Sequence, residues 1–88
     1  MAGRTRLPDN IVVYARPNCA ACEQVIRYLA NRSLHFRVLD VERDADAQAD
    51  LNAAGYTEDD LPVTFLDDAA VVGFDANRLD AYLVHITI

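Results

Sequence analysis

The two cysteines of this chain, Cys19 and Cys22, stand at a junction between two sequence patterns. Before them lies a continuous apolar run, Ile11–Ala15, which has the length of a buried strand. From Ala20 onward the apolar residues recur at helical spacing. The junction therefore predicts a strand, a tight turn and a helix whose first turn carries both thiols.

Two thiols three residues apart in the first turn of a helix lie on one face and can close a disulfide with little backbone movement. The unpaired N–H groups and the positive dipole end at a helix start favour a thiolate, which is the form that attacks disulfides. Cys22 shares its helix face with apolar residues, whereas Cys19 lies at the helix mouth. This asymmetry predicts dithiol–disulfide exchange, with Cys19 as the attacking thiol and Cys22 as the resolving thiol.

The length of 88 residues fits one small domain, and we expect a polar lead-in over residues 1–10 and a single domain over residues 11–88. The net charge of −6 argues against a nucleic-acid partner. No apolar stretch approaches the ~20 residues of a membrane span. No signal-peptide hydrophobic region follows the basic N-terminal residues, so we expect a cytoplasmic protein. In that setting a lone Cys-X-X-Cys pair is more often catalytic or metal-binding than a structural disulfide.

The middle of the chain alternates between helix and strand patterns. After a helix over residues 20–32, a second strand is expected over residues 34–41, with Leu34, Phe36 and Val38 on one face. A second helix is expected over residues 43–54, with Ala47, Leu51 and Ala54 on one face and Gly55 as its stop.

The last third of the chain predicts a hairpin and a final helix. The hairpin strands are expected over residues 62–66 and 69–74, turning at Asp67 and Asp68. Asp75 is the expected N-cap of a helix whose inward residues are Leu79, Tyr82, Leu83 and Ile86. The resulting order, β-α-β-α-β-β-α, predicts an α/β fold in which three helices cover one mixed four-stranded sheet.

In this order of elements, the Cys-X-X-Cys pair resembles the glutaredoxin family of thioredoxin-fold proteins over residues 11–83. Three motifs carry the resemblance: the strand and loop of residues 13–22, Leu61-Pro62 before a strand, and Gly73-Phe74-Asp75 before the last helix. Gly-Phe in the third motif is most similar to the NrdH-type redoxins, the small electron donors to ribonucleotide reductase.

The resemblance implies a cis peptide bond between Leu61 and Pro62, packed across the active site from Cys19. The backbone of Leu61 would then be free to pair with an extended substrate or with glutathione. By their places in the three motifs, the implied substrate-binding residues are Arg16, Pro17, Leu61, Pro62, Gly73, Phe74 and Asp75.

The function implied by the resemblance is that of a thiol–disulfide oxidoreductase, an electron carrier that reduces protein disulfides. It would hold no bound cofactor beyond its redox-active disulfide, and thioredoxin reductase or glutathione would reduce it. The expected partner is a disulfide-bearing protein, which is ribonucleotide reductase in the NrdH branch. We expect a monomer that binds neither membrane nor nucleic acid. The chain departs from glutaredoxins in having Asp60 before Leu61, where an anionic tripeptide would lie, and in lacking a double glycine.

Other interpretations stay open on the residues alone. The chain could be an iron–sulfur or metal-binding thioredoxin-fold protein, or a non-catalytic interaction module with vestigial cysteines. A structural zinc site is disfavoured because it needs four ligands and the sequence has no second Cys or His cluster. Three of the implied site residues also have an interpretation without a functional role. Arg16 could be an ordinary surface residue, Pro62 an ordinary proline at the start of a strand, and Phe74 a core residue.

Overall fold

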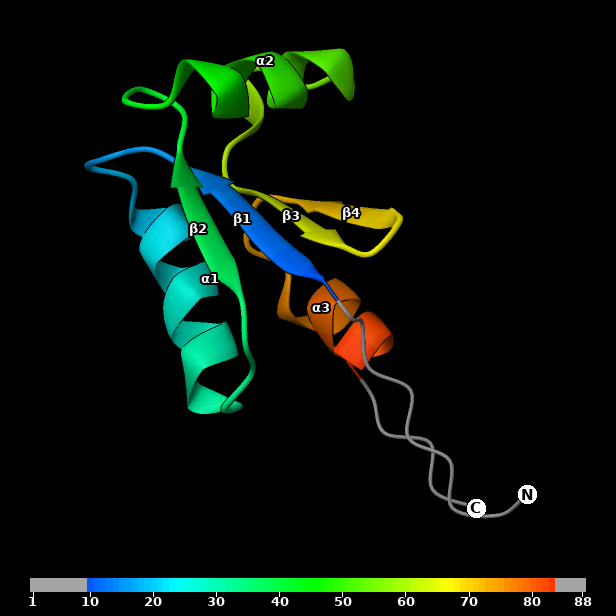
Figure 1. Ribbon diagram of the computed structural model, residues 1–88. Helices are drawn as coiled ribbons and strands as arrows, with labels where there is room; N and C mark the ends of the chain where they lie inside the picture. Colours follow the sequence, from blue (N-terminus) through cyan, green and yellow to red (C-terminus); the bar gives the residue numbers. More distant parts are fainter. Residues whose placement is uncertain (1–9, 84–88) are drawn as a thin grey trace.

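The computed structural model describes residues 10–83 of the chain (Figure 1). The elements follow in the order β1 (Ile11–Ala15), α1 (Ala20–Asn31), β2 (Arg37–Asp40), α2 (Ala45–Ala53), the 3-10 helix η1 (Glu58–Asp60), β3 (Val63–Leu66), β4 (Ala69–Val72) and α3 (Ala76–Leu83). The predicted order is therefore confirmed, with one short 3-10 turn added before β3.

The strands form one mixed four-stranded sheet in the order β2-β1-β3-β4. β1 runs parallel to β2 and antiparallel to β3, and β3 and β4 form the expected hairpin. The crossover through α1 permits the parallel pair, while the short turn at Asp67 and Asp68 requires an antiparallel one. As a result β1, which leads into the cysteines, lies in the interior of the sheet.

Helices cover both faces of this sheet, with α1 and α3 on one face and α2 on the other (Figure 1). The core between the sheet, α1 and α3, which we call the α1/α3 core, consists of Ile11, Val13, Ala15, Cys22, Val25, Leu29, Leu66, Val71, Leu79 and Leu83. The core beneath α2 consists of Val41, Ala47, Leu51 and Val63. Because both faces of β1 are covered, its sequence is a continuous apolar run instead of an alternating one.

The second strand is shorter than predicted, and one side chain that the sequence predicts to face inward is exposed. Leu34 and Phe36 precede β2 and still pack against the α1/α3 core. Val38, expected on the same inward face, is 43% exposed. β2 is an edge of the sheet, so no other strand among the described residues lies along its outer side to cover it.

Two helical positions were also predicted wrongly as inward-facing. Ala54 is exposed because α2 ends one residue earlier and Ala54 is its C-cap. Tyr82 is 39% exposed, since α3 meets the core through Leu79 and Leu83. Ile86, the last of the predicted inward residues, lies outside the described residues.

Thr64 on β3 is a buried polar residue between apolar neighbours. It is 0% exposed, and its hydroxyl has no hydrogen-bond partner among the described residues. Its partners in the sheet are Val13 and Val71, which both belong to the α1/α3 core. A buried hydroxyl without a partner lowers stability, because it has lost its hydrogen bonds to water.

Thr64→Val keeps the shape of the side chain and removes that hydroxyl, so we expect the free energy of unfolding to rise by about 1 kcal/mol. Urea unfolding of the oxidised protein measures the change. Thr64→Ser is the control: it keeps the hydroxyl and loses a methyl group, so it should lower stability. A clear fall in the stability of Thr64→Val would show that the hydroxyl is hydrogen-bonded in solution.

Candidate active site

A tight turn carries the chain from the end of β1 into α1. The turn residue Asn18 has a φ of +58°, in the left-handed region that asparagine tolerates better than most residues. Cys19 follows with extended backbone angles (φ −123°, ψ 104°) and occupies the N-cap position, so that α1 begins at Ala20. The first thiol is therefore placed at the positive end of the helix dipole, as predicted.

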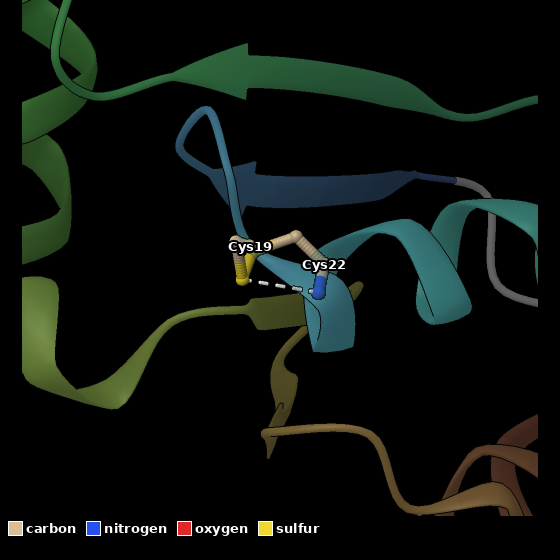
Figure 2. The surroundings of a disulfide bond; sticks show 2 residues. All are labelled: Cys19 and Cys22. Atoms are coloured by element: carbon tan, nitrogen blue, oxygen red, sulfur yellow. Dashed lines mark hydrogen bonds between the residues drawn. A yellow bond between two sulfur atoms is a disulfide. The ribbon is translucent and has the colours of Figure 1, made fainter.

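The sulfur of Cys19 itself caps the helix. The backbone N–H of Cys22 donates a hydrogen bond to Cys19 Sγ over an N–S distance of 3.1 Å (Figure 2). A disulfide joins the two residues, whose Cα atoms are 5.2 Å apart. Cys22 is 2% exposed within the α1/α3 core, whereas Cys19 is half-buried at its edge. The predicted difference in burial between the two cysteines is confirmed.

This geometry suits exchange of a disulfide with an outside partner. When the disulfide is reduced, the N–H of Cys22 and the helix dipole favour the thiolate form of Cys19. A disulfide in solution can reach the half-buried Cys19 but not the buried Cys22. The two sulfurs are bonded to each other, so the pair can alternate between a disulfide and a dithiol.

The second and third sequence motifs meet in the structure. The Leu61–Pro62 peptide bond is cis, as the resemblance implies. Pro62 is buried, and its carbonyl oxygen accepts a hydrogen bond of 2.7 Å from the N–H of Gly73. Gly73 has a φ of +75°, which favours glycine at this position. Leu61 is half-buried and packs against the cluster whose edge includes Cys19.

Four more of the predicted site residues lie in two loops. Arg16 and Pro17 are exposed in the turn that precedes Cys19. Phe74 is 37% exposed, which disfavours the interpretation as a core residue. Asp75 is the N-cap of α3, since its Oδ1 accepts a hydrogen bond of 3.1 Å from the N–H of Arg78. Capping alone is thus enough to explain an aspartate at position 75.

Tyr14, the residue before the end of β1, is a packing residue on the α2 side of the sheet. Its ring meets that of Phe65 edge to face, with centroids 5.6 Å apart. Burial raises the pKa of Tyr14 above its ordinary value of 10.0; the charge of Asp50 raises it further and that of Arg37 opposes the shift. The phenol is therefore neutral at physiological pH.

Sequence patterns alone do not identify a group of polar and aromatic side chains that joins α1 to α3. Tyr28 and Arg32 lie one helical turn apart, a spacing that could have indicated a pair. Their shared partner Asp80, however, lies 48 residues beyond Arg32. Only the packing of α3 beside α1 brings the three together.

Among residues 10–83, no three His, Cys, Asp or Glu side chains are grouped so that they could hold a metal ion. Within the same residues, no helix is both long and apolar enough to cross a membrane. Both cysteine sulfurs are engaged in the disulfide.

Known proteins that resemble this chain point to one family. The glutaredoxin family model matches residues 11–71. The glutaredoxin-like protein NrdH of Escherichia coli is 33% identical over 70 residues, which are 80% of this chain and 84% of that protein. The solved structure of the glutaredoxin-like protein NrdH-redoxin from Escherichia coli has a TM-score of 0.75 and 28% identity, over 90% of this chain and 99% of that one. The thioredoxin-like protein BC3987 has a TM-score of 0.74 and 29% identity, over 84% of this chain and all of that one (100%). The chain therefore belongs to the glutaredoxin family, in which it is a thiol redox protein of the NrdH type.

Proposed function

We propose that this redoxin reduces disulfide bonds in proteins, with Cys19 as its nucleophile and Cys22 as its resolving thiol. The observation that carries the proposal is the placement of the two sulfurs. Cys19 Sγ accepts a hydrogen bond from a backbone N–H in the first turn of α1, and a disulfide joins it to the buried Cys22. We place this activity in the cytoplasm, where such a pair is kept available as a dithiol.

The reaction transfers two electrons from the dithiol to the substrate. The Cys19 thiolate attacks one sulfur of the substrate disulfide, whose S–S bond breaks, and the departing sulfur takes up a proton. A mixed disulfide now links Cys19 to the substrate. Cys22 loses its proton and attacks Cys19 Sγ, which releases the second substrate sulfur as a thiol and forms the disulfide of Figure 2.

A reductant must then return two electrons, and we propose thioredoxin reductase for this role. Similarity to NrdH supports this choice, since the NrdH-redoxin of Escherichia coli is described as having a thioredoxin-like activity profile. Ribonucleotide reductase, the target that an NrdH-type redoxin implies, is the proposed physiological substrate.

The charges beside Leu61 disfavour glutathione as that reductant. The 3-10 helix η1 places three carboxylates, those of Glu58, Asp59 and Asp60, directly before Leu61. Asp60 Oδ2 accepts a hydrogen bond of 3.0 Å from the N–H of Thr57, which holds this carboxylate in place. A glutathione molecule that pairs with the Leu61 backbone brings net negative charge toward them, so the approach is repulsive.

Reduction of insulin by dithiothreitol tests the proposed activity. The redoxin should shorten the time before the released insulin chains precipitate, because its dithiol passes electrons to the insulin disulfides and dithiothreitol restores it. The control is the same protein after reduction and alkylation of both thiols with iodoacetamide, which should have no effect. Equal rates with the native and the alkylated protein would contradict protein disulfide reduction.

A further inference from the structure

Four side chains form a connected group between α1 and the start of α3, which we call the α1–α3 clamp: Tyr28, Arg32, Phe74 and Asp80. The ring of Tyr28 is its centre. Phe74 meets this ring edge to face, with centroids 5.8 Å apart and planes at 70°. The guanidinium carbon of Arg32 lies 3.7 Å from the centroid of the same ring, in cation–π contact.

Polar contacts fix the position of Tyr28 within the clamp. Its hydroxyl donates a hydrogen bond to Asp80 Oδ1 and lies 3.4 Å from the carbonyl oxygen of Ala76. Arg32 Nη2 donates to the same carboxylate oxygen at 3.1 Å. Tyr28 is thus attached to two successive turns of α3, while the side chains of Arg32 and Asp80 stay 41% and 54% exposed.

Phe74 connects the clamp to the active site. The preceding residue, Gly73, is hydrogen-bonded to the carbonyl of Pro62, so the backbone before Phe74 is held at the cis proline. Phe74 is nevertheless 37% exposed, and Val72, two residues before it, is 47% exposed. One side of the Phe74 ring contacts Tyr28 and the rest can meet a partner.

We propose that Tyr28 is a positioning residue for partner recognition: through the clamp it holds the exposed ring of Phe74 ready for the proteins that dock over the disulfide. The proposal rests on the proposed function, because it assumes exchange of electrons with protein partners. Aromatic side chains at interfaces contribute most when they are already ordered before binding, since ordering a free side chain lowers the affinity. In this role Tyr28 acts through Phe74 and not on the reacting sulfurs.

The test measures the redoxin as the varied substrate of thioredoxin reductase in the presence of NADPH. Tyr28→Leu preserves an apolar, helix-favouring side chain but removes the ring that meets Phe74. We expect its KM to rise about three- to tenfold, the range that corresponds to the loss of one aromatic pair, with kcat unchanged. Tyr28→Phe retains the ring but loses both hydroxyl contacts with α3, so its KM should rise by only about two- to threefold, less than that of Tyr28→Leu.

Two further variants separate positioning from stability. Asp80→Ala removes an exposed carboxylate and with it one of the two contacts of the Tyr28 hydroxyl with α3, so the protein should fold and its KM should rise about two- to threefold. Tyr82 is an exposed tyrosine of α3, the helix that carries Asp80, and it is not one of the four clamp residues. Tyr82→Leu should therefore leave KM unchanged. Reduction of every variant by dithiothreitol should proceed at the wild-type rate, because this small reductant does not need a docking surface.

Phe74→Ala distinguishes failure of this proposal from failure of the proposed function. The clamp proposal is supported if KM is raised in Phe74→Ala, in Tyr28→Leu and in Asp80→Ala. Adding Tyr28→Leu to Phe74→Ala should then cause no further rise in KM, because both changes remove the same aromatic contact. Wild-type KM values in both Tyr28→Leu and Asp80→Ala would overturn it while leaving protein disulfide reduction intact. A wild-type KM in Phe74→Ala would overturn it as well. A wild-type protein that the reductase does not reduce at all would instead show that the proposed function is wrong, and the clamp proposal would be lost with it.

Discussion

Cys19→Ser is expected to abolish reduction of protein disulfides, a loss on the order of a thousandfold or more in kcat/KM. A serine hydroxyl is not ionised at neutral pH and forms no disulfide, so the first step of the exchange cannot occur. The remaining thiol, Cys22, is 2% exposed and out of reach of a protein disulfide. The insulin assay measures the loss, and the variant should give the rate seen without redoxin.

The matched control for Cys19→Ser is Cys22→Ser. Each of these variants retains one thiol and loses the internal disulfide, so the two differ only in which sulfur is left. Iodoacetamide at neutral pH should modify the Cys22→Ser protein rapidly and the Cys19→Ser protein slowly, because only Cys19 is at once accessible and placed at the helix N-terminus. Fast modification of the protein that retains only Cys22 would reverse the assignment of the two roles.

Cys22→Ser has the second large expected effect: the protein attacks a substrate disulfide once and then stays bound to it. The Cys19 thiolate forms the mixed disulfide as in the wild type. With Cys22 replaced, the chain has no second thiol to attack Cys19 Sγ and release the substrate. With NADPH and thioredoxin reductase as the reductant and no dithiothreitol, turnover of insulin should fall by about a hundredfold or more, as expected for loss of a group that reacts in the catalytic cycle. Non-reducing electrophoresis should show a covalent redoxin–substrate complex.

The covalent complex should disappear on addition of dithiothreitol, and mass spectrometry should locate the bond at Cys19. The Cys19→Ser protein, treated in the same way, should form no such complex. A Cys22→Ser protein that reduces protein disulfides at the wild-type rate would contradict the resolving role of the buried thiol. Capture of the substrate by Cys19→Ser would contradict the role of Cys19.

The strand and helix around the cysteines could be predicted because local patterns determine them. The apolar run Ile11–Ala15 belongs to a strand buried on both faces, and it agrees with β1 residue for residue. The face shared by Cys22, Val25 and Leu29 likewise agrees with the buried side of α1. In both cases the signal lies within a few consecutive residues, where periodicity reports burial directly.

Side chains were predicted less well where their burial depends on distant elements. Val38 belongs to an apolar alternation, but its exposure is decided by the edge position of β2 in the sheet order. Tyr82 follows the apolar spacing of α3, yet the sheet contacts only the side of the helix with Leu79 and Leu83. A pattern along the chain indicates which face is apolar but not how far the neighbouring element extends.

The candidate site divides in the same way. The cysteine pair is a local motif, and its geometry follows from the start of one helix. The cis bond before Pro62 was expected only from the family resemblance, because most bonds before proline are trans. The clamp around Tyr28 had no sequence signal that reached across to Asp80, since its contacts depend on how two helices pack.

Oxidation of NADPH in two parallel recycling systems is the most direct test of the proposed electron path. Both contain the redoxin and insulin; one adds thioredoxin reductase, and the other adds glutathione with glutathione reductase. We expect rapid, redoxin-dependent oxidation of NADPH with thioredoxin reductase and only the background rate with glutathione. Turnover with glutathione alone would contradict the proposed reductant and the role given to the carboxylates of η1. No redoxin-dependent turnover in either system would contradict the conclusion that Cys19 and Cys22 form a working dithiol.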